Sequence, residues 1–226
     1  MVPGPPWAQL GSHSSMTPYN SEGGDWLRKD LQHVAPKLAV PVTKTYVYYG
    51  APEEVRYWYP AAPNLDNGFG TQANKKVDVY LLLKNTEQNG LGIPLPAGRI
   101  RAFKRDEADG SSEFIGEDVI QHTPVDEDVM AKLGSAFDIV GDRRQTDYTV
   151  NSDGHEATES FEIKLRNHKT EPVHVLIKEN LYRAANWNIT AASDKWDKLD
   201  YRTIQFPVDV PKDGEKTVTY TVKYTW

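Results

Sequence analysis

Aromatic side chains are the residues of this chain best suited to hold a ligand. Tryptophan and tyrosine rings exposed on the face of a β-sandwich stack against sugar rings, as they do in carbohydrate-binding modules. Buried aromatic rings instead fill cores and favour strands, so core packing is the competing interpretation. The candidate ligand-binding residues are Trp58, Trp187, Trp196 and Tyr201.

A block of polar residues at 143–147 interrupts a region that is otherwise typical of strands. A buried arginine needs a partner carboxylate, because an unpaired charge in a protein interior is costly. Asp118, Asp138 or Asp142 can supply that carboxylate. We expect a buried polar network between two β-units here, and a ligand-binding arginine is the alternative. The residues assigned to this network are His122, Asp138, Arg143 and Arg144.

An acidic cluster lies between residues 117 and 128. Its carboxylates are the hard oxygen ligands that calcium prefers. The spacing is not that of an EF-hand loop, so a solvated face with two turns is the favoured interpretation and calcium the alternative. The cluster consists of Glu117, Asp118, Asp126, Glu127 and Asp128.

Motifs of familiar enzyme classes are missing from the sequence. The chain has no cysteine, and its six histidines show no HExxH or HxH spacing for zinc. There is no Gly-x-Ser-x-Gly elbow and no phosphate-binding glycine loop. A carboxylate pair for glycoside hydrolysis has no residues that single it out. We therefore predict a protein that is not an enzyme and assign no catalytic residue, metal or cofactor.

Composition excludes two kinds of partner. The 226 residues carry a net charge of −6, which argues against nucleic-acid binding through a basic surface. No run of 18 apolar residues exists, so the sequence predicts no membrane span. The N-terminus lacks the basic and apolar regions of a signal peptide. Gly11-Ser12-His13 is typical of a tag-cleavage scar, so residues 1–15 are either native or part of a tag.

Alternation of apolar and polar residues predicts an all-β fold. The clearest example is the final segment, where Val218, Tyr220, Val222 and Tyr224 alternate with threonines and a lysine. Similar alternation covers 77–83, 161–165, 173–177 and 204–210. Tight-turn signals such as Asn-Gly and Asp-Gly separate these runs.

The predicted fold is an antiparallel β-sandwich made of two packed β-units. Residues 1–43 form a Pro/Gly/Ser-rich arm with one short helix expected at 25–33. Residues 44–134 form the first unit, which begins with aromatic strands at 44–49 and 55–59. Residues 135–226 form the second unit, whose seven or so strands are typical of an immunoglobulin-like sandwich with Trp187 as a core plug.

Four segments resemble a bacterial family named domain of unknown function 4139, found in proteins related to mucoidy inhibitor A. They are PLPAGRIRAFKRD (94–106), FIGEDVIQHTP (114–124), LGSAFDIVGDRRQTDY (133–148) and FEIKLRNHKTEPV (161–173). The resemblance implies a β-rich, exported bacterial module without a settled activity. Since His122 falls in a matching segment, we expect it to hydrogen-bond a turn.

The leading hypothesis is a non-catalytic structural or interaction module that is secreted, periplasmic or on the cell surface, with its native signal peptide not present in this chain. We expect a protein partner or self-association, with Lys44–Tyr59 or Lys37–Val42 donated to a neighbour's sheet. A carbohydrate-binding module is the alternative function. A glycan-active hydrolase is the third.

Overall fold

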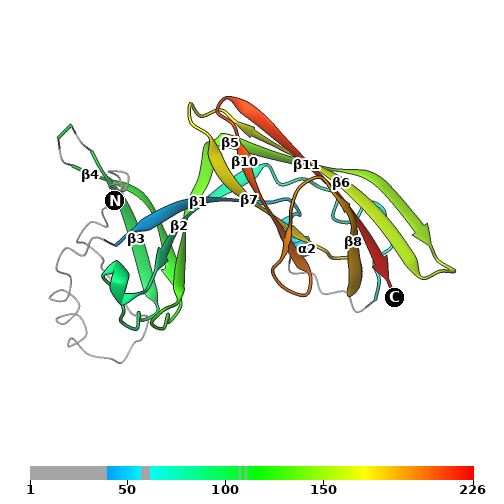
Figure 1. Ribbon diagram of the computed structural model, residues 1–226, viewed down its shortest axis with the longest axis horizontal. Helices are drawn as coiled ribbons and strands as arrows, with labels where there is room; N and C mark the ends of the chain where they lie inside the picture. The colour runs from blue at the N-terminus through cyan, green and yellow to red at the C-terminus, as the bar shows by residue number, and fades with distance from the viewer. Residues whose placement is uncertain (1–39, 57–61, 107, 110) are drawn as a thin grey trace. The chain divides into compact units, whose positions relative to one another are not determined.

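The computed structural model describes residues 40–56, 62–106, 108–109 and 111–226, and this part is nearly all β (Figure 1). The all-β prediction is therefore confirmed. Within these described residues, helical structure is limited to the short turns α2 (Glu53–Arg56) and η1 (Glu87–Asn89). The strands are β1 (Val42–Tyr49), β2 (Lys76–Lys84), β3 (Gly98–Arg105), β4 (Ser112–Ile120), β5 (Asp128–Asn151), β6 (Glu156–Asn167), β7 (Val173–Asn180), β8 (Asn186–Ala192), β9 (Asp197–Lys198), β10 (Thr203–Val210) and β11 (Gly214–Thr225).

Nine of these strands form one mixed sheet in the order β8-β11-β6-β5-β2-β1-β7-β10-β9. The sheet is not purely antiparallel, because β1 pairs with β7 in parallel from Tyr46↔Val175 to Tyr49↔Lys178. Strands β3 and β4 form a separate antiparallel pair. Three consecutive residues of β1, Tyr46 to Tyr48, are at most 6% exposed. Because successive side chains of a strand point to opposite faces, β1 is covered on both sides.

The chain divides into two compact units. Unit one contains the described residues 40–45 and 79–134, and unit two contains residues 46–78 and 135–226. The division has one boundary at 134/135, and it places residues 46–78 in the second unit. The reason is the pairing of β1 with β7, which joins segments more than a hundred residues apart and leaves no mark on local periodicity.

Unit one is built around a small apolar core. Val40, Leu83, Ile120 and Val129 are each at most 6% exposed and pack together. Ile120 belongs to the β3–β4 hairpin, in which Gly98 pairs with Ile120 and Arg105 pairs with Ser112. Burial of each large aliphatic side chain in such a cluster contributes about 1.5–3 kcal/mol.

Unit two is a sandwich. Strands β8 and β9 stand at opposite ends of the sheet order, yet only four residues, 193–196, connect them. A connection of this length spans at most roughly 20 Å, so the two ends of the sheet must lie near each other. The sheet therefore folds over, with β8, β11, β6 and β5 in one layer and β1, β7, β10 and β9 in the other. The rings of Phe206 on β10 and Tyr220 on β11, which are not paired strands, lie 5.6 Å apart between the layers.

The core of unit two follows the sequence alternation closely. On β6, Phe161, Ile163 and Leu165 are at most 1% exposed, while the residues between them are half-buried. On β11, the inward residues from Val218 to Tyr224 are at most 2% exposed. Figure 1 shows β6 and β11 running side by side, and they pair over the whole of β11, from Gly214↔Asn167 to Thr225↔Glu156.

Two expectations about the N-terminal region differ from the structure. Val55 and Arg56 lie in α2, where both amides donate to the Pro52 carbonyl, and so they are not the start of a strand. The rest of that predicted strand, 57–59, and the predicted helix at 25–33 lie outside the described residues. Residues 44–49 belong to β1, which lies between β2 and β7 in its own sheet. Those residues are therefore not available as a donor strand for a neighbour.

Candidate functional site

Two buried ion pairs cross the interior of unit two. Arg143 on β5 binds Glu179 on β7 with a separation of 2.9 Å between Nε and Oε2, and both side chains are fully buried. Arg183, which follows β7, binds Glu159 on β6 at 2.7 Å with at most 1% exposure on either side chain. Both pairs therefore link the two layers of the sandwich.

Several neighbours contact the Arg143–Glu179 pair. Tyr220 donates its hydroxyl to Glu179 Oε2 at 2.6 Å, and Arg143 Nη1 donates to the Gly70 carbonyl at 2.8 Å. The guanidinium carbon of Arg143 lies 3.7 Å from the centre of the Phe161 ring, within cation–π range. Gly50 is needed beside the pair, because a Cβ there would fall 1.7 Å from Glu179 Oε1.

Arg183 fastens a surface loop to the sandwich. Its two terminal nitrogens donate to the carbonyls of residues 64, 66, 67 and 69 as well as to Glu159. Glu159 also accepts from Gln145 Nε2 at 2.8 Å and from the Tyr182 hydroxyl at 3.2 Å. The Tyr148 hydroxyl also donates to the Leu65 carbonyl at 2.9 Å, and the Asn64 amide donates to the Arg183 carbonyl at 2.9 Å, so the loop is held by these bonds and not by strand pairing.

Burial shifts the pKa values of the ionisable groups in this network. Burial raises the pKa of Glu179 above its ordinary value, although Arg143 and the Tyr220 hydroxyl oppose the effect. Burial acts to lower the pKa of Arg143, but the Glu179 carboxylate together with Tyr220 and Tyr182 outweighs it, and the pKa lies well above its ordinary value. Burial also raises the pKa of the Tyr220 hydroxyl. Arg143 pairs with Glu179 and Arg183 pairs with Glu159, so the arrangement is that of a structural core. One buried polar atom of each of these four residues, Arg143 Nη2, Glu179 Oε1, Arg183 Nε and Glu159 Oε2, has no hydrogen-bond partner among the described residues.

Of the four residues assigned to a polar network, the structure places Arg143 in a buried one. Its partner is Glu179, not Asp118, Asp138 or Asp142. Arg144 is the next residue on the strand and so points to the other face, where its side chain is 68% exposed and pairs with Glu162. Asp138 is exposed. The network joins two layers of unit two and was not expected there.

His122 lies in unit one and is exposed. Its Nδ1 accepts a hydrogen bond from the Ala97 amide at 3.3 Å, next to the isolated bridge between Leu95 and Thr123. This is a turn contact of the kind expected for that residue. It takes no part in the Arg143 network.

Glu159, Glu179 and Arg183 were missed by the sequence reasoning. A usable signal exists for the first two. Glu159 lies in phase with the buried residues Phe161 and Ile163 on β6, and Glu179 lies in phase with Ile177 on β7. A charged residue on the buried face of a strand predicts a buried ion pair. Arg183 lies beyond the end of β7 and carries no comparable signal.

The acidic residues near 117–128 are engaged in local structure. Glu117 forms ion pairs with Arg99 and Arg101 across the β3–β4 hairpin. Asp118 accepts from the amides of Val119 and Lys132. Among the described residues no cluster of three or more histidine or acidic side chains is arranged to hold a metal ion.

The aromatic candidates gather where β8 and β9 approach each other. Trp187 on β8 pairs with the buried Tyr224, so its ring faces the interior of the sandwich, and its Nε1 donates to the Tyr201 carbonyl at 2.7 Å. Trp196 lies 6.5 Å from Trp187, with the rings inclined at 58°. Lys198 Nζ lies 4.7 Å from the Trp187 ring centre. The fourth candidate, Trp58, lies outside the described residues.

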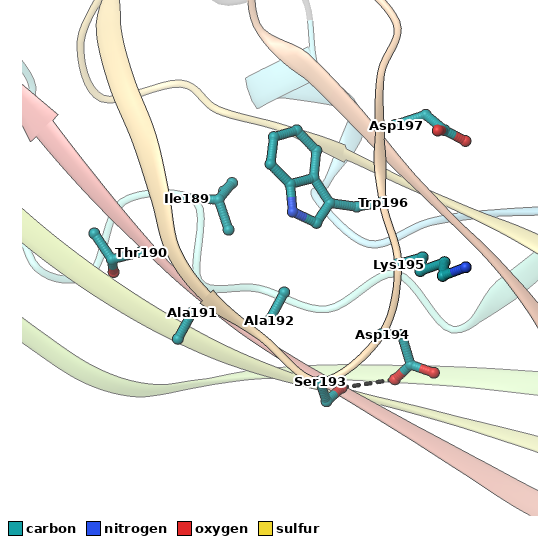
Figure 2. A pocket seen from close by; sticks show the side chains of 9 residues that line it. All are labelled: Ile189, Thr190, Ala191, Ala192, Ser193, Asp194, Lys195, Trp196 and Asp197. Atoms are coloured by element: carbon teal, nitrogen blue, oxygen red, sulfur yellow. Dashed lines mark hydrogen bonds between the residues drawn. The ribbon is translucent and has the colours of Figure 1, made fainter.

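A groove of about 640 Å³ runs beside these tryptophans and is formed by one continuous segment, residues 189–197 (Figure 2). Figure 2 shows the Trp196 ring projecting into the space between its own segment and Ile189 on β8. Ser193 donates to Asp194 at 2.7 Å, and Lys216 Nζ binds the same carboxylate at 2.6 Å. Burial acts to raise the pKa of Asp194, but the hydrogen bonds from Lys216 and Ser193 outweigh it and lower the pKa.

The two outermost strands of the sheet differ in how they are protected. β9 is two residues long, and both residues are charged, which is a common way to block pairing with another chain. β8 has seven residues, Asn-Trp-Asn-Ile-Thr-Ala-Ala, with no charge and no proline. It pairs with β11 on one side, with a bulge at Thr190. The outer edge of β8 is therefore less protected against pairing with another chain than the outer edge of β9.

No family model matches this chain, and neither a curated protein nor a solved structure matches it. The resemblance to domain of unknown function 4139 thus stays a prediction. In the described part of the chain, no helix is both long and apolar enough to cross a membrane.

Proposed function

We propose that this protein is a non-catalytic, extracytoplasmic structural module that associates with a second copy of itself through the outer edge of β8. The observation that carries the proposal is the uncharged outer edge of that seven-residue strand. An open edge offers backbone amides and carbonyls to a strand of another chain. The extracytoplasmic location rests on the family resemblance alone.

The side chains of β8 suit pairing with an identical strand. When two β8 strands are set antiparallel about Asn188, before the bulge, each Trp187 lies opposite Ile189 of the other copy. Opposed pairs of this kind stabilise antiparallel strands, and no like charges meet. The bulge at Thr190 increases the local twist, so we expect association that depends on concentration.

Pairing between two β8 strands produces a closed assembly of two copies. A two-fold axis through the centre of two β8 strands uses the same surface on both copies, so the product is a dimer and not a filament. This differs from donation of an N-terminal strand, which joins subunits head to tail. The buried place of β1 favours the edge of β8 over residues 44–49 as the point of contact.

Size-exclusion chromatography with light scattering tests the proposal. We expect the mass to rise with concentration toward about twice the 25.5 kDa of the chain. Asn188→Glu places a charge on β8 opposite Lys223 and should leave a monomer. Thr217→Glu is the matched control. It places the same charge on β11, opposite Lys164 of β6, within the β11–β6 pairing and away from the β8 edge. A wild-type monomer at every concentration, or equal behaviour of the two variants, would contradict the proposal.

A further inference from the structure

We infer that two water molecules are bound inside unit two, one completing each of its buried ion pairs. This inference rests on the geometry of the pairs and is independent of the proposed association through β8. In the first pair, Arg143 Nε donates to Glu179 Oε2 at 2.9 Å, and in the second, Arg183 Nη2 donates to Glu159 Oε1 at 2.7 Å. An arginine and a carboxylate often form two parallel hydrogen bonds, so each pair here has one of the two.

Each pair leaves one donor and one acceptor without a hydrogen bond. These atoms are Arg143 Nη2 and Glu179 Oε1 in the first pair, and Arg183 Nε and Glu159 Oε2 in the second; all four are buried and have no partner among the described residues. Nε and Nη2 share one edge of the planar guanidinium, so the open nitrogen of each arginine lies beside the nitrogen that already binds the glutamate. The open donor and the open acceptor of one pair are therefore near each other.

The protein directs its own donors to one oxygen of each glutamate. Glu179 Oε2 accepts two hydrogen bonds and Glu159 Oε1 accepts three, whereas the second oxygen of each accepts none from the described residues. A carboxylate oxygen or a guanidinium N–H that is buried without a partner carries a large desolvation cost, and such groups are nearly always bonded either to protein or to ordered water. The four open atoms therefore require partners that the described side chains do not supply.

The combination of a donor and an acceptor at each site selects water as the ligand. A water molecule accepts from an N–H and donates to a carboxylate, and buried waters typically form about two to four such bonds with polar groups that lack protein partners. A cation placed at either site would meet the like charge of the guanidinium, and an anion would meet that of the carboxylate. One neutral molecule that both donates and accepts matches each site.

The second site has a third polar group beside it. The hydroxyl of Tyr224 on β11 is also buried without a hydrogen-bond partner in the described part of the chain. Val222, two residues before it on the same strand, pairs with Glu159 on β6, and both Val222 and Tyr224 lie on the inward face. We expect the Tyr224 hydroxyl to be the third partner of the second water.

Crystal structures at atomic resolution of the wild type and of Arg143→Met/Glu179→Leu test the inference. In the wild type we expect one water at hydrogen-bonding distance, roughly 2.5–3.2 Å, from both open atoms of the first pair, and another from both open atoms of the second. The double variant replaces the donor and the acceptor of the first site by apolar side chains, so it should lose the first water and keep the second. Arg144→Met/Glu162→Leu is the matched control on the exposed pair, and it should keep both waters.

Two direct hydrogen bonds between arginine and glutamate with no water between them would overturn the inference, and so would a double variant that keeps the first water. Water–protein NMR of the wild type in solution supplies a second test that needs no variant. We expect dipolar transfer of magnetisation between water and the Nε proton of Arg183, with the sign opposite to that of proton exchange in the rotating frame. The absence of that transfer would overturn the second site. A monomeric protein that shows both waters would contradict the association through β8 while supporting this inference.

Discussion

The interior of unit two and its β8–β9 end use polar and aromatic residues in opposite ways. In the interior, Arg143 pairs with Glu179 and Arg183 pairs with Glu159, with every one of these side chains at most 1% exposed. At the β8–β9 end, the longer strand carries no charge, and an aromatic groove opens beside it. The buried charges of unit two therefore belong to its framework, and we propose the uncharged β8 edge as the surface for association.

The physical basis of this difference is the cost of an unpaired charge. Two buried ion pairs fix the distance and register of the sandwich layers, because breaking either one leaves a buried charge without its partner. An edge strand has the opposite requirement. An edge strand that pairs with another chain must offer its backbone groups, and a charge on it would block the approach.

Breaking the buried Arg143–Glu179 ion pair has the largest expected effect on the free energy of unfolding. Arg143→Met leaves Glu179 buried without its partner, and we expect the free energy of unfolding to fall by about 3–5 kcal/mol. Arg144→Met is the control on the adjacent residue, whose ion pair is mostly exposed, and it should leave the stability nearly unchanged. Urea denaturation measures both. Adding Glu179→Leu to Arg143→Met should restore much of the loss; a double variant as unstable as the single one would argue against a purely pairwise role.

A smaller effect is expected from pH. Because burial raises the pKa of Glu179, the folded protein binds a proton at this group more readily than the unfolded chain does. Its contribution to stability is therefore full below the ordinary glutamate pKa and is lost as pH rises through the raised value. We expect the unfolding free energy of the wild type, relative to that of Glu179→Gln, to fall as the pH rises across that window.

The exposed Glu162 is the control, because its effect on the pH dependence of stability is expected to have the opposite sign. The hydrogen bond from Arg144 lowers the pKa of Glu162, so that group stabilises the protein above its ordinary pKa and the contribution is lost as pH falls. Parallel curves for Glu179→Gln and Glu162→Gln, measured by chemical denaturation at several pH values, would contradict the account of the buried pair.

The smallest stability effect concerns the support of the groove. Trp187→Phe removes the hydrogen bond from Nε1 to the Tyr201 carbonyl but keeps an aromatic ring, and we expect a loss of about 0.5–1.5 kcal/mol. Trp226→Phe is the control, and it should cost less. Thermal unfolding compares the two variants. Equal losses would show that the hydrogen bond does not distinguish Trp187 from an ordinary aromatic residue.

Local periodicity was enough to predict β6, β7, β10 and β11 of unit two. Phe161 to Leu165 and Val218 to Tyr224 alternate without interruption, and a strand has no other way to bury one face and expose the other. The same phase, applied to Glu159 and Glu179, points to buried charges. Both burials could have been predicted from the sequence, because Glu159 and Glu179 lie in phase with the apolar residues of their strands.

Long-range pairing was not accessible in this way. The parallel pairing of Tyr46 with Val175 and the approach of β8 to β9 depend on how distant segments meet, and neither depends on composition within a window. The partner of Arg143 was missed for the same reason, since Glu179 lies 36 residues away on the opposite layer. Trp196 was a sequence candidate, but its support by Trp187 follows from that approach of the two sheet ends.

The central claim is that the edge of β8, and not the buried charge network, is the surface for association. Sedimentation equilibrium of two variants tests it most directly: Asn188→Glu changes the edge, and Arg143→Met/Glu179→Leu changes the interior. We expect the edge variant to be a monomer with nearly unchanged stability and the interior variant to associate as wild type does. An edge variant that still associates, or an interior variant that is folded but monomeric, would contradict the account.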